Sequence, residues 1–258
     1  MIDGHMHLEY GDLSVDYVLE FVNAAKECGL TTIQILDHTH RFIEFAPIYD
    51  ELKIAAQQQK EWLEKKKLEP LSKYHKLIED VKRMDLDIEV RFGLEVCYTP
   101  NSEEFIRNIL AQYKYDFIIG SIHSIDGLLY DMSSFSKEIL WNVYDANHIY
   151  KRYYEILEQL ISSDLFTQVG HPDTIKMFNI YPTYDLTPTY HKIAELMKKH
   201  HVKAENNTGC YFRYNHKDMG LSSEFLEILK EHDVEIIPCS DGHYPNQIGK
   251  GIKEVSNL

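Results

Sequence analysis

Short apolar runs alternate with segments of helical periodicity along the chain, and this alternation restricts the fold more than any other feature. Such a pattern is typical of βα units, in which helices connect parallel strands. The sequence therefore predicts an α/β fold. We expect seven strands, at Ile2–Met6, Thr31–Leu36, Ile88–Val96, Phe117–Ile122, Phe166–Val169, Val202–Glu205 and Glu235–Cys239.

The segments between these strands carry recognisable helix ends. Ser14 is expected to cap a helix with apolar residues at i, i+3, i+4 and i+7, and Gly29 is expected to close it. Residues 50–84 and 136–163 are helix-rich; the first segment is strongly charged, and we expect a solvated helical excursion there. Further helix starts are expected at Asn101 or Ser102, at Thr187 followed by Pro188, and at Ser222 or Ser223.

Length and charge exclude several classes of protein. A chain of 258 residues buries roughly three-quarters of its surface on folding, so its core needs no disulfide or cofactor for stability. Neither an internal repeat nor a Gly/Ser linker divides the sequence, which indicates a single domain over residues 1–258. The net charge of −14 disfavours non-specific binding to nucleic acid or to an anionic membrane.

Other features bear on the cellular compartment. The first residues lack the basic and apolar regions of a signal peptide, and no apolar run approaches the 18 residues of a membrane span. The four cysteines, Cys28, Cys97, Cys210 and Cys239, are scattered and form no CxxC pair. We interpret them as reduced thiols and expect a cytoplasmic protein.

Histidines and carboxylates gather at the predicted strand ends. In a closed parallel barrel the C-terminal strand ends converge on one face, where barrel enzymes keep their chemistry. Six of the seven strands would deliver such residues there, and the remaining one ends in Asn206 and Asn207, which could supply hydrogen bonds. The residues at these ends are His5, His7, Asp37, His38, Glu95, His123, His171, Asp241 and His243.

The spacing of these residues suits cation binding. In an extended segment, residues i and i+2 point to the same side, so His5 and His7 can coordinate the same cation. A carboxylate such as Glu95 can bridge two cations about 3.5–4 Å apart. A single histidine at a strand end is usually an ordinary polar residue, but the whole set predicts a metal centre. Surface or structural roles are expected for the histidines in predicted helices: His75, His148, His191, His200, His201 and His232.

The ordered motifs HxH, DH, GxE, SxH, GHP and SDxH, which run from His5 to His243, resemble the polymerase and histidinol phosphatase (PHP) family of metallohydrolases. The strings DGHMHLEY, GLEVCY, ENNTGCYFRY and SDGHYPNQIGKG look most like its histidinol-phosphatase branch. The resemblance implies a distorted (β/α)7 barrel with two or three divalent metal ions, Zn, Mn or Fe. It also implies hydrolysis of a phosphoester.

The resemblance also implies a ligand set. The first cation would be held by His5, His7, Glu95 and Asp241, and the second by Glu95, His123 and His171. His38 and His243 would hold a third. Many relatives supply another histidine at the position of Leu13, where this chain departs from the pattern. Glu9 or Asp12 could substitute, although Asp12 also suits a plain turn after Gly11.

Substrate-contacting residues follow less directly from the sequence. Arg213 is the candidate phosphate clamp, in a loop after the sixth strand, and its alternative is an ordinary surface arginine. His40 could protonate the leaving alkoxide or contact substrate, or could be a plain loop histidine. Asn207 could bind substrate. Arg91 and Arg41 are less well placed; Arg91 lies deep in its strand or on its outer face.

The resemblance implies metal-dependent hydrolysis of L-histidinol phosphate, whereas the residues themselves indicate only a phosphoester; Glu95, Asp241 and His40 are the expected catalytic residues. The cations would lower the pKa of a bridging water, the resulting hydroxide would attack phosphorus, and the cations would offset phosphoryl charge. The alternatives are another PHP phosphoesterase, such as a nucleotide phosphatase, phosphodiesterase or exonuclease, and a non-catalytic metal-binding module. The expected partner is a small phosphorylated substrate, with no nucleic acid or membrane, and the oligomeric state is left open.

Overall fold

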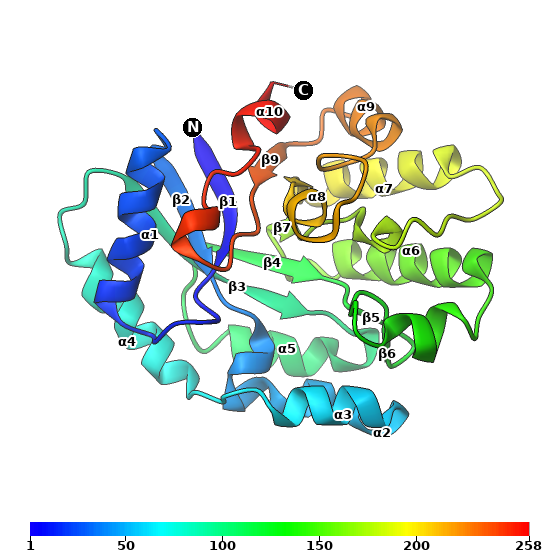
Figure 1. Cartoon of the computed structure of the whole chain (residues 1–258), viewed down its shortest axis with the longest axis horizontal. Helices are drawn as coiled ribbons and strands as arrows, with labels where there is room; N and C mark the ends of the chain where they lie inside the picture. Colours follow the sequence, from blue (N-terminus) through cyan, green and yellow to red (C-terminus); the bar gives the residue numbers. More distant parts are fainter. Residues whose placement is uncertain (258) are drawn as a thin grey trace.

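The computed structural model describes residues 1–257 and contains a sheet of seven parallel strands in the order β1-β2-β3-β4-β7-β8-β9 (Figure 1). All seven predicted strands are confirmed, with ends within two residues of those expected. Their bounds are Ile2–His7 (β1), Thr32–Leu36 (β2), Glu89–Cys97 (β3), Phe117–Ser121 (β4), Gln168–Val169 (β7), Lys203–Asn207 (β8) and Ile236–Cys239 (β9).

The sheet curls into a nearly closed barrel. Met6 of β1 bridges to Gly242, just beyond β9, and the His7 amide donates to the Gly242 carbonyl at 2.8 Å. Deeper in the same seam, the buried Asp3 carboxylate accepts from the Ser240 amide at 2.8 Å. The seam is thus joined by a single bridge and a side chain rather than by a full ladder. This confirms the distorted (β/α)7 barrel.

Helices cover the outside of the barrel (Figure 1). The Ser14 side chain caps the first helix by accepting from the Tyr17 amide, as expected, and Gly29 follows with φ +74°. The bounds are Val15–Glu27 (α1), Asp50–Ala55 (α2), Gln57–Glu64 (α3), Leu71–Lys82 (α4), Glu103–Leu110 (α5), Ala146–Ser162 (α6), Thr187–His200 (α7), Gly209–Tyr214 (α8), Ser223–Glu231 (α9) and Ile252–Ser256 (α10).

One cap is assigned wrongly by the sequence. Thr187 is the first residue of α7 rather than its cap, and the Asp185 carboxylate accepts from the Thr187 amide at 3.0 Å. Pro188 is therefore the second helical residue rather than the first. The N-cap position is Leu186, whose side chain makes no capping bond, so the residue types that favour caps did not mark the start of this helix.

The expectation of a solvated excursion over residues 50–84 is wrong for its second half. Helix α4 connects β2 to β3 and buries Leu71, Tyr74, Leu77, Ile78 and Val81. The Tyr74 hydroxyl donates to the carbonyl of Gly93 in β3 at 2.8 Å, so α4 is tied directly to the sheet. The many surface lysines and glutamates of this segment masked an ordinary amphipathic crossover helix.

A short hairpin that the sequence did not predict follows β4. Its strands are Ser124–Ile125 (β5) and Leu128–Leu129 (β6), which pair antiparallel beside the end of the barrel (Figure 1). Strands of two residues carry too little periodicity for recognition. Within the described residues, no helix is long and apolar enough to cross a membrane.

Candidate metal centre

The carboxylate of Glu95, near the end of β3, is the centre of a histidine cluster at one mouth of the barrel. Its Oε1 lies 2.8 Å from His171 Nε2 and 3.1 Å from His123 Nε2, and its Oε2 lies 2.6 Å from His38 Nδ1. Glu95 is 1% exposed. Burial favours its neutral form, but the surrounding histidines more than offset this and hold its pKa well below the ordinary value. A charged carboxylate with both oxygens facing imidazoles is suited to bridging two cations.

The HxH pair and Asp241 form one compact group of ligand atoms. His5 Nε2 and His7 Nε2 face each other at 2.8 Å, and Asp241 Oδ1 lies 3.8 Å and 3.3 Å from them. Burial and the neighbouring His38 and His243 hold the pKa of His7 well below its ordinary value. A neutral imidazole is the form that ligates a metal, so this donor set fits a divalent cation.

Two further groups lie beside the first. In each of the three groups the potential ligand atoms lie within 4.8 Å of one another. The sequence predicted every residue in these groups, and the fold brings all of them together. The groups are His5, His7 and Asp241; His38, Glu95 and His123; and His7, His38 and His243.

Backbone strain accompanies two of the predicted ligands. His171 has φ +31° and Asp241 has φ +54°, in a region that residues with a Cβ atom rarely adopt. Each lies two residues after the end of a strand, β7 for His171 and β9 for Asp241. Strain of this kind is found where function fixes the position of a side chain.

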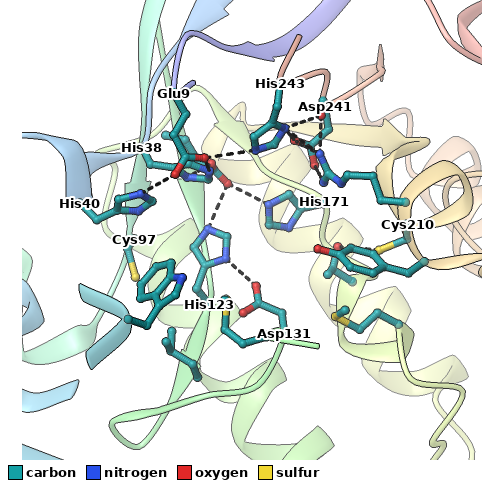
Figure 2. A pocket seen from close by; sticks show the side chains of 18 of the residues that line it. Glu9, His38, His40, Cys97, His123, Asp131, His171, Cys210, Asp241 and His243 are labelled. Carbon is teal, nitrogen blue, oxygen red and sulfur yellow. Dashed lines mark hydrogen bonds and ion pairs between the residues drawn. The ribbon is translucent and has the colours of Figure 1, made fainter. Parts of the chain in front are cut away.

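The structure distinguishes the two candidates for an extra ligand. Glu9 Oε2 lies 3.6 Å from His243 Nε2 and 3.9 Å from His38 Nε2 (Figure 2). Its other oxygen accepts from His40 Nε2 at 3.1 Å and from Lys66 Nζ at 2.6 Å. The Asp12 side chain is 79% exposed and pairs with Lys67. Glu9 therefore belongs to the cluster, and Asp12 lies outside it.

A buried carboxylate that the sequence analysis missed lies behind the cluster. Glu205 of β8 accepts through Oε1 from His5 Nδ1 at 2.8 Å and from Gln168 Nε2 at 2.7 Å. Its Oε2 accepts from the His171 amide and from Asn207 Nδ2, both at 2.9 Å. The sequence analysis assigned only Asn206 and Asn207 to this strand end, and the signal that could have found Glu205 was a glutamate directly before them.

Glu205 controls which nitrogen of His5 is available. Burial opposes protonation of the His5 ring, but Glu205, Asp241 and Glu95 outweigh it and hold the pKa well above its ordinary value. The bond to Glu205 keeps a proton on Nδ1, so Nε2 is the nitrogen that a cation can take by displacing a proton. A histidine held from behind in this way is the usual arrangement in metal sites.

Asp131 plays the equivalent part for His123. Its Oδ2 lies 2.7 Å from His123 Nδ1, which directs His123 Nε2 at Glu95 (Figure 2). Asp131 follows the unpredicted β5–β6 hairpin, so nothing in the sequence placed it near the strand ends. Asp37, by contrast, belongs to none of the three groups of ligand atoms. Its carboxylate accepts from the buried Arg41 at 2.6 Å, and Arg41 also donates to the Leu8 carbonyl.

Arg213 lies beside the cluster, but in helix α8 rather than in the expected loop. Its Nη2 donates to Asp241 Oδ2 at 2.7 Å, and its Nη1 lies 2.8 Å from His243 Nδ1. Burial alone would raise the pKa of the Asp241 carboxyl group, but the nearby charges of Arg213 and His5 outweigh it and hold this pKa well below the ordinary value. Arg91 pairs with Glu89 near the start of β3, far along the strand from Glu95.

His40 and Asn207 occupy different positions. His40 borders the cavity and bonds to Glu9, and burial, with the charge of nearby groups, lowers its pKa to about 3. Asn207 lies behind Asp241, to which its Nδ2 is 3.4 Å distant, and its Oδ1 accepts from the Gly209 amide. Its amide is therefore committed to holding other residues rather than facing the cavity.

The cluster forms one side of a cavity of about 380 Å³. The cavity wall includes two positively charged side chains, Arg213 and Lys66. The Lys66 ammonium lies 4.5 Å from the ring centre of Trp62. The charged segment before α4 thus contributes to the site, contrary to expectation.

The six histidines assigned to helices belong to none of the three groups of ligand atoms; His75, for example, stacks on Tyr113.

Known proteins resemble this chain in sequence and in fold. A protein from Deinococcus radiodurans named probable histidinol-phosphatase is 25% identical over 100% of this chain and 94% of its own length. A Listeria monocytogenes structure, provisionally named histidinol phosphatase HisK, has a TM-score of 0.79 at 21% identity and covers 98% of this chain and 99% of its own.

A second solved structure has the same fold. It is histidinol phosphate phosphatase (HisK) from Lactococcus lactis, complexed with zinc, L-histidinol and phosphate, with a TM-score of 0.71 at 15% identity; it covers 99% of this chain and 91% of its own. The model of the PHP domain family matches residues 3–209, which include the strand ends from His5 to Asn207. The chain therefore belongs to the PHP domain family.

Proposed function

We propose that this chain is a metal-dependent phosphomonoesterase that hydrolyses L-histidinol phosphate. The observation that carries the proposal is the convergence of histidine nitrogens on the buried Glu95 carboxylate, with Arg213 at the edge of the same cavity. The substrate is supported by the relatives: the Deinococcus protein is named probable histidinol-phosphatase, and the Lactococcus enzyme was crystallised with L-histidinol and phosphate.

The donor set supports two or three divalent cations. We assign His5, His7, Glu95 and Asp241 to the first, Glu95, His123 and His171 to the second, and Glu9, His38 and His243 to a third. Imidazole and carboxylate ligands suit Zn²⁺, Mn²⁺ or Fe²⁺. Bound cations supply positive charge at the phosphoryl oxygens and lower the pKa of water.

Arg213 is proposed to bind the phosphoryl group. Its guanidinium is held in the cavity wall by Asp241 and His243, so little side-chain freedom is lost when substrate binds. The planar fork matches two phosphoryl oxygens, and the group cannot compete as a metal ligand. A Cβ atom at Gly209 would lie 2.8 Å from Arg213 Nη2, so glycine there leaves the space that the guanidinium uses.

His40 is proposed to contact the leaving group through a water molecule. Because burial lowers its pKa to about 3, the ring is neutral near neutral pH and carries one N–H, which Glu9 holds at Nε2. Nδ1 is then an acceptor, and a water molecule bonded to it would donate to the leaving oxygen. Its bond to Glu9 also fixes that carboxylate toward His38 and His243.

A substrate panel tests this proposal. Metal-supplemented protein should hydrolyse L-histidinol phosphate with a kcat/KM at least tenfold above that for nucleoside monophosphates, bis-p-nitrophenyl phosphate and single-stranded DNA. Preference for a nucleotide or a diester would assign a different PHP activity to the chain. Metal binding without hydrolysis of any of these compounds would favour a non-catalytic module.

The cytoplasmic location remains part of the proposal. All four cysteines are free, in agreement with reduced thiols. The net charge of −14 likewise supports a small phosphorylated substrate over nucleic acid.

A further inference from the structure

Asp131 differs from the other acidic residues of the cavity. Glu95 is surrounded by histidines, Asp241 is paired with Arg213, and Glu9 holds His40 and Lys66. Asp131 uses only Oδ2, for His123 Nδ1, and Oδ1 accepts no hydrogen bond from residues 1–257. The side chain is 12% exposed and borders the cavity. One carboxylate oxygen is therefore available to a ligand.

The segment that carries Asp131 is firmly held. The Tyr130 amide donates to the His123 carbonyl at 3.0 Å, and Trp141 Nε1 donates to the Tyr130 carbonyl at 2.8 Å. On the other side, the Met132 amide donates to the Ser136 hydroxyl at 2.8 Å. Because these bonds fix the backbone and His123 fixes the side chain, the free oxygen needs little ordering before it can bind a partner.

Asp131 lies in a different part of the cavity from Glu9 and Asp241 (Figure 2). In Figure 2, Asp131 lies at the opposite end of the cavity from Glu9 and His243, with Cys97 on one side and Cys210 on the other. Leu129, Met132 and Met177 also line the cavity, together with the hydroxyl-bearing Thr174 and Tyr214. A carboxylate in a cavity whose other walls are apolar or uncharged suits an organic cation, since the attraction is stronger where little water competes.

We propose that Asp131 Oδ1 binds a protonated amine on the alcohol portion of the substrate, so that the site selects phosphomonoesters of amino alcohols. The inference rests on the proposed function and assigns the group that recognises the leaving portion. The phosphoryl group would lie between the histidine cluster and Arg213, and the ammonium would reach Asp131 at the other end of the cavity. L-Histidinol phosphate has such an amine.

The test is a ratio of two substrates. We compare kcat/KM for L-histidinol phosphate with that for the same ester whose amine is replaced by hydrogen. The wild type should prefer the amine by at least about tenfold, as a charge-assisted hydrogen bond would give, and Asp131→Asn should remove most of that preference. Damage to His123 positioning lowers both values together and cancels from the ratio.

Glu205→Gln is the matched control. It also removes a carboxylate that holds a metal-cluster histidine, but it lies behind His5 and does not border the main cavity. Activity on both esters should fall while their ratio stays at the wild-type value. A ratio that falls equally in both variants would overturn the proposal, because the preference would then come from the metal centre.

Calorimetric titration with L-histidinol, which has no phosphate, gives a second readout. Asp131→Asn should weaken its binding about tenfold, and the des-amino alcohol should bind equally weakly to both proteins. Unchanged histidinol binding, or equal hydrolysis of the two esters by the wild type, overturns the amine site but leaves a phosphatase. If no phosphomonoester is hydrolysed, the proposed function fails, and this titration alone decides the amine site.

Discussion

Replacing Glu205 by glutamine should weaken the first cation site without touching any ligand. All four partners of the carboxylate are donors, two on each oxygen. In either orientation the new NH₂ group would face two of them, so two hydrogen bonds are lost in a buried place. At about 1–3 kcal/mol for each unsatisfied donor, the free energy of unfolding should fall by roughly 2–6 kcal/mol.

The same change acts on His5. If the amide oxygen turns away from His5 Nδ1, the proton on that nitrogen is no longer held, and the tautomer with a proton on Nε2 competes with metal binding. Loss of such a partner typically weakens metal affinity by about 10–100-fold, or about 1.4–2.7 kcal/mol.

Competition between the metal-free protein and a coloured chelator for Zn²⁺ measures this affinity, and circular dichroism confirms that the variant is folded. Glu235→Gln is the control, since Glu235 pairs with Lys203 at the surface. A folded Glu205→Gln protein that binds every Zn²⁺ equivalent as tightly as wild type would refute the reasoning.

Three further outcomes are expected. Arg213→Ala should lower kcat/KM on the monoester by at least about tenfold, and Arg213→Lys should fall between it and wild type; equal losses on a diester in steady-state assays would leave Arg213 a general structural residue. Glu95→Gln should remove more activity than His243→Ala, because the amide loses charge between two cations; the reverse order of kcat values would exclude Glu95 as the bridge. Burial of His75 lowers its pKa to about 4, so the neutral ring is favoured on folding. This preference contributes about 1–2 kcal/mol to the free energy of unfolding after allowance for solvent screening; the contribution is complete above pH 6.5 and is lost as pH falls toward 4. In denaturant titrations, the free energy of unfolding of His75→Phe should fall less than that of the wild type over the same pH window.

The sequence was sufficient for the barrel and for the gathering of histidines and carboxylates at its mouth. Both depend on local patterns: apolar runs mark the parallel strands, and the residue after a strand end must lie at the C-terminal face. His5, Glu95 and Asp241 lie far apart in the chain, yet each is found beside the others because closure of the sheet brings the strand ends together.

The supporting residues could not be found in the same way. Glu205 lies inside a strand, and Asp131 follows a hairpin of two-residue strands that has no periodic signal. Their function comes from which histidine nitrogen they reach, which is a property of tertiary packing. The charged segment 50–84 was misjudged for a related reason, since composition records its exposed face and not the buried face of α4.

Stepwise restoration of metal to chelated protein tests the central claim most directly. Metal equivalents per chain and the rate of phosphate release from L-histidinol phosphate are measured on the same samples. The metal-free protein should be inactive, and activity should appear only as the content approaches at least two equivalents, because Glu95 lies between two ligand groups. Full activity in protein that holds less than one equivalent would contradict a catalytic metal centre.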